Sequence, residues 1–168
     1  ERQRVEIDLT KSLETDEAYG IGKNGEIFDV TFGLYAQKDI TAADGTVIPA
    51  DGLIEIISFD ENGYGKVATD LPFGSYYVRE ISTNSAYIIS DQKYPVIFDY
   101  AGQDTATVHI TANDGEAIEN KIIYGSVSGK KLDEDGKALG GALIGIFKTG
   151  TEEFTKENAI QTTTSKDD

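Results

Sequence analysis

Hydrophobic and polar residues alternate along most of this chain. In "RVEIDLTK", every second residue from Val5 to Lys11 falls on one face of an extended strand, and the residues between them are polar. The same period of two recurs in "FDVTFGLYA", "GLIEIISF", "YYVRE", "YPVIFDY", "TATVHIT" and "AIENKIIY". Turns rich in glycine, asparagine and aspartate separate these segments, and none of them reads as a convincing amphipathic helix. The pattern predicts an all-β, Ig-like antiparallel β-sandwich.

The chain also repeats itself weakly. "FGLYA" at 32–36 is similar to "IGIFK" at 144–148, and "LIEIISFDEN" at 53–62 aligns with "AIQTTTSKDD" at 159–168. The repeat predicts one complete β-sandwich module over residues 1–124 and the N-terminal part of a second module over 125–168. Half a sandwich would expose unpaired edges and an apolar face. We therefore expect a second polypeptide, either the rest of a cleaved chain or a swapped neighbour, to complete the 125–168 module.

The composition narrows the classes of partner. The chain has 30 acidic and 15 basic residues and a formal charge of −15, which repels phosphate backbones and anionic membranes. We therefore expect no nucleic-acid partner and no membrane partner. Cysteine is absent, which excludes disulfides and thiolate chemistry. No apolar run is long enough to span a membrane and no signal peptide begins the chain, so we expect it to be mature, truncated or internal to something larger.

Motifs for metal binding and hydrolysis are weak. The acidic turns "DENGYG" and "DEDGKA" lack the ligand spacing of a calcium loop and are typical of hairpin turns. The single histidine, His109, falls on the polar face of its segment, so we expect no histidine-based metal site and no Ser-His-Asp site. A carboxylate hydrolase would need a second inward-facing carboxylate near Glu80, and the sequence offers none. We expect no metal, no cofactor and no enzymatic turnover.

Three polar residues fall in the core phase of separate segments. Lys11 continues the apolar face of the first segment, Glu80 shares a face with Val78, and Asn120 shares a face with Ile118. Taken singly, each has an ordinary explanation: the lysine can reach solvent, the glutamate can pair with a lysine, and the asparagine can cap a loop. Taken together, a lysine, a carboxylic acid and a carboxamide are the reactants for an intramolecular amide bond.

Burial would supply the chemistry for that bond. Removing a lysine from water lowers its pKa and lets it present a neutral, nucleophilic amine. A buried glutamic acid can stay protonated and carry protons between reacting groups. Attack of the Lys11 amine on the Asn120 carboxamide would release ammonia and leave an isopeptide bond, with Glu80 as the catalytic acid. Each chain would react once, so this is self-modification and not enzymatic catalysis.

Three segments carry a resemblance to a known family. "LPFGSYYVREISTNSAY" resembles the E-box segment of CnaB-type (SpaA-like, prealbumin-like) domains of Gram-positive surface adhesins and pilins, and Glu80 and Tyr87 keep its spacing. "KKLDEDGKALGGALIGIF" is similar to the family's opening segment, and "IENKIIYG" resembles its closing strand. The resemblance implies a prealbumin-like sandwich.

The resemblance also implies roles for individual residues. Lys11 and Asn120 would form the isopeptide bond, Glu80 would be the catalytic acid, and Lys131 would be the isopeptide lysine of the second module. The chain departs from the family where "TNSA" replaces the usual Ala-Pro-x-Gly before the tyrosine, and where "KSL" replaces Lys-x-Asp. Lys23, in "GIGKNG", is therefore the alternative lysine.

These features favour a structural stalk module of a Gram-positive adhesin or pilus subunit. Such a protein would be extracellular, at the bacterial cell surface, and anchored to the cell wall through a region not in this chain. Its partners would be neighbouring modules of the same surface protein. The alternative is a ligand-binding adhesin domain that recognises a host matrix protein or glycan, because "SLETDEAYGIGKNGEIFD" is longer than its counterpart in the second module and binding often resides in loops.

Overall fold

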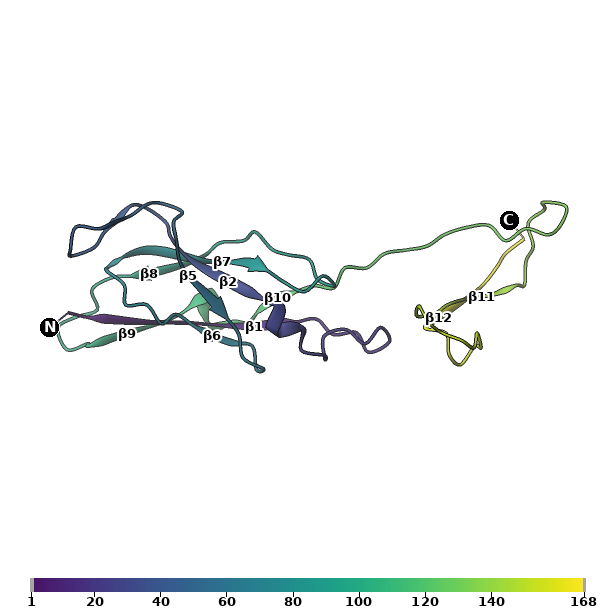
Figure 1. Cartoon of the computed structure of the whole chain (residues 1–168), viewed down its shortest axis with the longest axis horizontal. Coiled ribbons are helices and arrows are strands. Elements are labelled where there is room, and N and C mark those ends of the chain that lie inside the picture. Colours follow the sequence, from purple (N-terminus) through teal and green to yellow (C-terminus); the bar gives the residue numbers. More distant parts are fainter. Residues whose placement is uncertain (1, 168) are drawn as a thin grey trace. The chain divides into compact units, whose positions relative to one another are not determined.

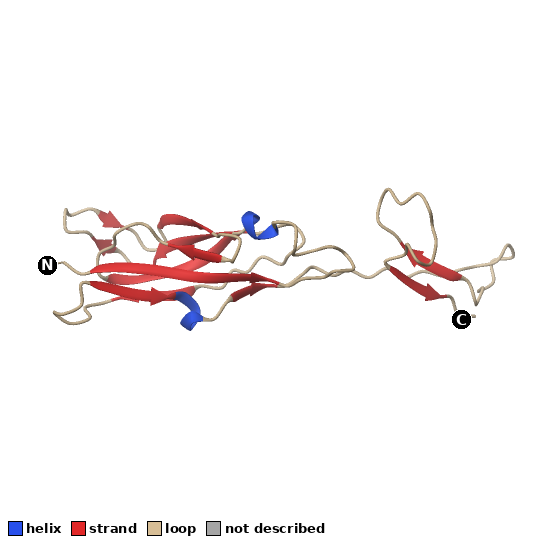
Figure 2. Cartoon of the chain, turned by 90° about the horizontal axis from the view of Figure 1, so that it is seen from below, coloured by secondary structure: helices blue, strands red, loops and turns tan. Residues whose placement is uncertain are grey.

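Strands make up almost all of the regular structure in the computed structural model, which describes residues 2–167 (Figure 2). Helix in this described part is confined to two short 3-10 segments, η1 (Glu26–Asp29) and η2 (Ala112–Gly115). None of the described helices is long and apolar enough to cross a membrane. The chain divides into two compact units, Glu1–Ile123 and Tyr124–Asp168. The all-β class predicted from the alternation is confirmed.

Two sheets form the layers of the first unit (Figure 1). One sheet is antiparallel throughout, in the order β5 (Leu53–Ser58), β2 (Thr31–Ala36), β7 (Gly74–Ser82) and β8 (Tyr94–Phe98). The other is built around β1 (Arg4–Leu13) and contains β6 (Tyr64–Lys66), β9 (Thr107–Thr111) and β10 (Ile118–Asn120). A short ribbon of β3 (Ile40–Thr41) and β4 (Val47–Ile48) connects β2 to β5 along the chain.

The core lies between these two sheets because each strand turns one face inward. Every second residue of β1 is buried from Val5 to Lys11, as the alternation predicts. From the opposite sheet, Phe32, Val78 and Phe98 are at most 2 % exposed, and the Phe32 ring meets Phe59 edge-on at 5.5 Å between centroids. Burial of these apolar side chains removes apolar surface from water, which is the main favourable contribution to folding.

The pairing of β1 departs from a purely antiparallel arrangement. β1 is antiparallel to β6 but parallel to both β9 and β10, which pair with successive parts of it. η2 connects β9 to β10 along the chain. Its residues Asn113 and Asp114 adopt left-handed conformations. The result is that the closing strand β10 runs beside the end of β1, so that Lys11 pairs with Ile118 and Leu13 pairs with Asn120.

The second unit contains one antiparallel hairpin, formed by β11 (Leu143–Ile146) and β12 (Gln161–Thr164). Its register reproduces that of β2 and β5 under the sequence repeat: Ile144 pairs with Thr163 as Phe32 pairs with Ile57, and the other three pairs correspond in the same way.

The glycine of each hairpin also has the same environment. An aromatic ring two residues further on lies against it, Tyr35 against Gly33 in the first unit and Phe147 against Gly145 in the second. Burial differs between the units, because within the described residues 124–167 no residue is buried. The β2–β5 hairpin is covered by a second layer, and the matching hairpin leaves its apolar residues exposed.

Candidate functional site

Four polar residues are buried in the first unit, and three of them lie on separate strands, whereas Gln3 precedes β1. Lys11 on β1 and Asn120 on β10 are 2 % exposed, and Glu80 on β7 is 5 % exposed. Buried lysine and glutamate side chains are rare unless they are paired or functional. The alternation of the sequence predicted the burial of all three.

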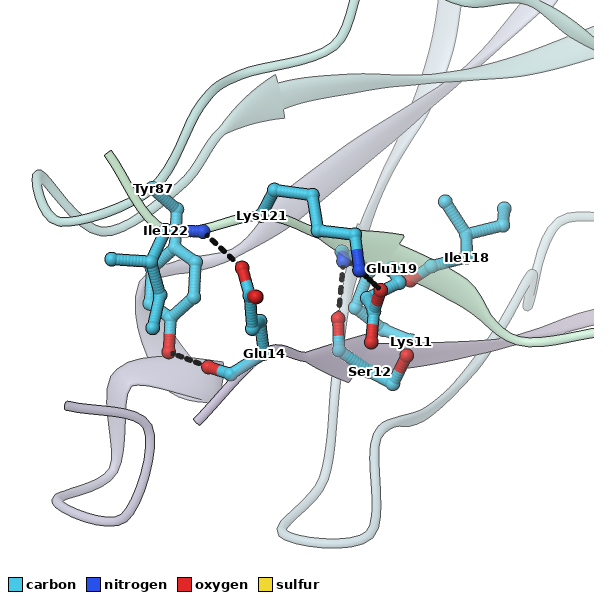
Figure 3. Close-up of polar contacts among 8 residues, drawn as sticks. All are labelled: Lys11, Ser12, Glu14, Tyr87, Ile118, Glu119, Lys121 and Ile122. Carbon is cyan, nitrogen blue, oxygen red and sulfur yellow. Dashed lines mark hydrogen bonds and ion pairs between the residues drawn. The ribbon is translucent and has the colours of Figure 1, made fainter. Parts of the chain in front are cut away.

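Parallel pairing places Lys11 and Asn120 on the same face of neighbouring strands. Leu13 is opposite Asn120, and Lys11 is opposite Ile118, which is two residues earlier on each strand. Residues two apart on a strand point to the same face. The Lys11 amine donates to the backbone carbonyl of Ile118 at 2.8 Å and to that of Ser12 at 2.7 Å (Figure 3). The amine is thus held at the junction of β1 and β10.

Glu80 and Asn120 are in direct contact. The Asn120 Nδ2 donates to Glu80 Oε2 at 3.0 Å and to the carbonyl of Ile88 at 2.7 Å. Glu80 Oε2 also accepts the backbone N–H of Ser90 at 3.1 Å. Among the described residues, Glu80 Oε1 and Asn120 Oδ1 are buried without a hydrogen-bond partner. Unpaired buried oxygens are costly, so this is a polar site with unused bonding capacity.

Burial makes the neutral form of the Lys11 amine more accessible. Burial lowers the pKa of Lys11 from 10.5 to about 8, although the negative charges of Glu80 and Glu119 oppose the shift. Glu119 is itself ion-paired with Lys121. An amine with this pKa is neutral far more often near physiological pH than an ordinary lysine is, and the neutral form is the nucleophile.

The other two lysines singled out from the sequence are exposed. Lys23 is exposed, and its amine is ion-paired with Glu17. Lys131 is exposed in the second unit, where its amine donates to the carbonyl of Leu132 at 3.0 Å. The structure therefore brings Lys11, and not the alternative Lys23, beside the strand that carries Asn120.

Comparison with known sequences identifies the family of this chain. A sequence model described as the SpaA prealbumin-like fold domain matches residues 15–116, more than half of the chain. The chain belongs to this SpaA family. The matched segment of the SpaA domain includes Glu80, whereas Lys11 and Asn120 lie just outside it.

Solved structures similar to this SpaA domain come from Gram-positive bacteria. The Bacillus anthracis TIE protein has a TM-score of 0.54 at 18 % identity, covering 96 % of this chain and 26 % of its own. A minor pilin of Streptococcus agalactiae has a TM-score of 0.44 at 22 % identity, covering 77 % of this chain and 49 % of its own. The major pilin subunit of Bacillus cereus has a TM-score of 0.37 at 20 % identity, covering 70 % and 29 %.

The chain thus spans between about a quarter and a half of the length of these proteins. The comparison with curated proteins found no match. At these identities the structural likeness concerns the fold.

The sequence did not reveal the backbone groups that complete the SpaA-domain site. The carbonyl of Ile88, the N–H of Ser90 and the carbonyl of Ile118 hold the three side chains, and a backbone group has no residue signature. The one available signal was Tyr87, in the same loop as Ile88 and Ser90. Its hydroxyl donates to the carbonyl of Glu14 at 2.7 Å and fastens that loop to the end of β1.

The backbone of Gly63 lies directly against the backbone of Lys11 and so sets the position of Lys11. Its carbonyl accepts the Lys11 N–H at 2.6 Å, its φ is +77°, and a Cβ on it would lie 1.9 Å from the Lys11 carbonyl oxygen. We expect Gly63→Ala to lower the free energy of unfolding by ~3 kcal/mol or more, combining left-handed strain with a steric clash. Urea unfolding would measure the loss.

Gly45→Ala is the matched control. Gly45 has a similar φ of +85°, but nothing lies within 4 Å of its added Cβ. It should lose only the ~1–2 kcal/mol of left-handed strain. Equal losses in the two variants would contradict the assignment of Gly63 as a spacer for β1.

Proposed function

We propose that this SpaA-type domain is a load-bearing stalk module of a Gram-positive cell-surface adhesin or pilus subunit, closed by a Lys11–Asn120 isopeptide bond. The observation that carries the proposal is that Lys11 and Asn120 are buried on the strands that open and close the first unit, with the buried Glu80 of β7 in contact with Asn120. Membership of the SpaA family, matched over residues 15–116, supports an extracellular setting at the cell surface. Neighbouring modules of the same surface protein would be its partners.

The reaction needs no group beyond these three side chains. The Lys11 amine attacks the carboxamide carbon of Asn120, a new N–C bond forms, and the bond to Nδ2 breaks. One amine proton must move to Nδ2, which leaves as ammonia. Glu80 is suited to carry that proton because its Oε2 contacts Nδ2 at 3.0 Å. The reaction consumes Lys11 and Asn120 and occurs once per chain, so it is self-modification.

The position of the bond explains how it would bear load. β1 opens the unit and β10 closes it, so tension that enters at one end and leaves at the other would pass through Lys11 and Asn120. The noncovalent pairing of these two strands covers only three register pairs. A covalent link there would replace the disulfides that a chain without cysteine cannot form.

The second unit fits the first part of another module of the same family. Its hairpin keeps the register of β2 and β5, and its opening segment would place Lys131 as the isopeptide lysine. Ile144 and Ile146 are more than 40 % exposed, whereas their counterparts Phe32 and Leu34 are fully buried. Further strands, of the same or a second polypeptide, are needed to cover them.

Intact mass in denaturant tests the proposal. We expect the wild-type chain to lack the mass of one ammonia and Glu80→Gln to keep the full mass, because an amide at this position cannot carry the proton. Lys23→Ala is the control and should show the same deficit as the wild type. A second polypeptide that completes the second unit would appear in the same spectrum as a separate mass.

A wild-type chain of full mass would contradict the bond and favour the alternative function, a ligand-binding adhesin domain for a host matrix protein or glycan. One observation favours that alternative. The long loop after β1, at Gly22–Phe28, lines a pocket of about 480 Å³ together with the turn at Glu61–Gly63. Lys11 and Ser12 also line it, so the pocket lies at the same end of the unit as the candidate site.

A further inference from the structure

Glu14 contacts the closing segment, which is β10 and the three residues after it (residues 118–123), with both its backbone and its side chain. It is the first residue beyond β1, and its N–H donates to the carbonyl of Asn120 at 3.0 Å. Its Oε2 accepts the N–H of Ile122 at 2.8 Å (Figure 3). Two consecutive hydrogen-bonding positions of the closing segment, at 120 and 122, are therefore bound by one residue.

The carboxylate of Glu14 replaces a backbone group. In a regular parallel ladder, one residue uses its N–H and its C=O to bond two residues of the neighbouring strand that are two positions apart. The carbonyl of Glu14 would then accept the N–H of Ile122. That carbonyl instead accepts the hydroxyl of the buried Tyr87 at 2.7 Å (Figure 3), and the side-chain carboxylate takes over the Ile122 N–H. Without it, a buried residue would have an unpaired N–H.

The closing segment is held from its other side by the loop of Tyr87. The N–H of Ile88 donates to the carbonyl of Lys121 at 2.9 Å, and the N–H of Ile123 donates to the carbonyl of Ala86 at 2.8 Å. This loop also supplies the Ile88 carbonyl that orients the carboxamide of Asn120. Glu14 is thus the residue to which both the closing segment and the orienting loop are fastened.

We propose that Glu14 is a positioning residue for the isopeptide reaction, which fixes the register of the closing segment so that the Asn120 carboxamide stays beside Glu80 and within reach of the Lys11 amine. The inference rests on the proposed function and names a residue outside the reacting set. Glu14 needs to accept a hydrogen bond and does not need to ionise. An amide oxygen at the same place should therefore serve.

Two substitutions and one matched control test this role. Glu14→Gln keeps an acceptor oxygen, and Glu14→Ala removes it. The control is Glu55→Ala, because the Glu55 carboxylate also accepts backbone N–H groups, those of Ala68 and Thr69 at 3.1 Å, on a strand remote from the closing segment. Each chain is made with a photocaged lysine at position 11, uncaged in denaturant, and refolded by dilution, after which intact mass follows the loss of ammonia with time.

We expect Glu14→Gln and Glu55→Ala to react at the wild-type rate and Glu14→Ala to react about tenfold more slowly, because only Glu14→Ala leaves the buried N–H of Ile122 without its hydrogen bond. Amide hydrogen exchange supplies a readout that does not depend on the bond. The N–H of Ile122 should be protected in the wild type and in Glu14→Gln, and should exchange at least roughly tenfold faster in Glu14→Ala.

Three results would overturn the inference while leaving the proposed function intact. These are a Glu14→Ala variant that matches the wild type in rate and Ile122 protection, equal slowing of Glu14→Ala and Glu55→Ala, and a Glu14→Gln variant as slow as Glu14→Ala. A wild-type chain that never loses ammonia would overturn the proposed function and the positioning role together. Ile122 exchange would still show whether Glu14 fastens the closing segment.

Discussion

Pulled from its two ends in a single-molecule force experiment, the first unit of the wild-type chain is expected to extend hardly at all. The bond would close the chain from Lys11 to Asn120, so that only the short segments outside it can lengthen, by less than about 50 Å. In Lys11→Met, a substitution of similar volume that removes the amine, roughly 110 residues become extensible. At ~3.3–3.6 Å per residue they would add roughly 350–400 Å of contour length.

A second variant separates the bond from the packing of Lys11. Glu80→Gln leaves Lys11 and Asn120 in place but should block the proton transfer, so it should extend as far as Lys11→Met. A wild-type chain that extends by the same long step as both variants would contradict the load-bearing role. By analogy with a disulfide that closes a loop of this size, the bond should also add ~4–5 kcal/mol to the free energy of unfolding.

The period of two in the sequence was enough to predict the buried position of the three polar residues and most strands of the first unit, but it missed β3, β4 and β6. In β1 and β7 it placed Lys11 and Glu80 on the inward face, and the structure has both buried. It failed at the end of "AIENKIIY", where Tyr124 falls in the inward phase but is 60 % exposed. β10 ends at Asn120, the bridge between Tyr87 and Ile122 continues the alternation as far as Ile122, and the chain leaves the sheet after it.

The partners of each strand could not be predicted from the alternation. A period of two describes one strand and its faces, and it is the same for parallel and antiparallel neighbours. The parallel pairing of β1 with β9 and β10 depends on contacts about a hundred residues apart in the chain and on the left-handed residues of η2. That pairing is what brings Lys11 near Asn120, so the sequence offered the residues of the site but not its assembly.

The function of Glu14 lay beyond sequence reasoning for a similar reason. Its carboxylate is needed only because the hydroxyl of Tyr87 already occupies the Glu14 carbonyl. This replacement of a backbone acceptor by a side-chain acceptor depends on three segments that meet in the folded chain: the end of β1, the loop of Tyr87 and the closing segment. In the sequence, Glu14 is one of many acidic residues in a chain of charge −15.

The rate of bond formation is expected to rise about 100-fold between pH 6 and pH 9 and then to level off. The nucleophile is the neutral amine of Lys11, whose pKa is lowered to about 8 by burial. Two units below that pKa only ~1 % of the amine is neutral, and the neutral fraction grows about tenfold per unit until pH approaches the pKa. Refolding the uncaged chain at a series of pH values, with ammonia loss followed by mass, would give the profile.

The pH at which the rate levels off distinguishes a buried lysine from an ordinary one. With the ordinary pKa of 10.5, the rate would still be climbing at pH 10. Glu119→Gln sharpens the test, because the negative charge of Glu119 raises the pKa of Lys11 and its removal should move the plateau to lower pH. A rate that keeps rising to pH 10, or a plateau that Glu119→Gln moves upward, would contradict the assignment of Lys11 as a desolvated nucleophile.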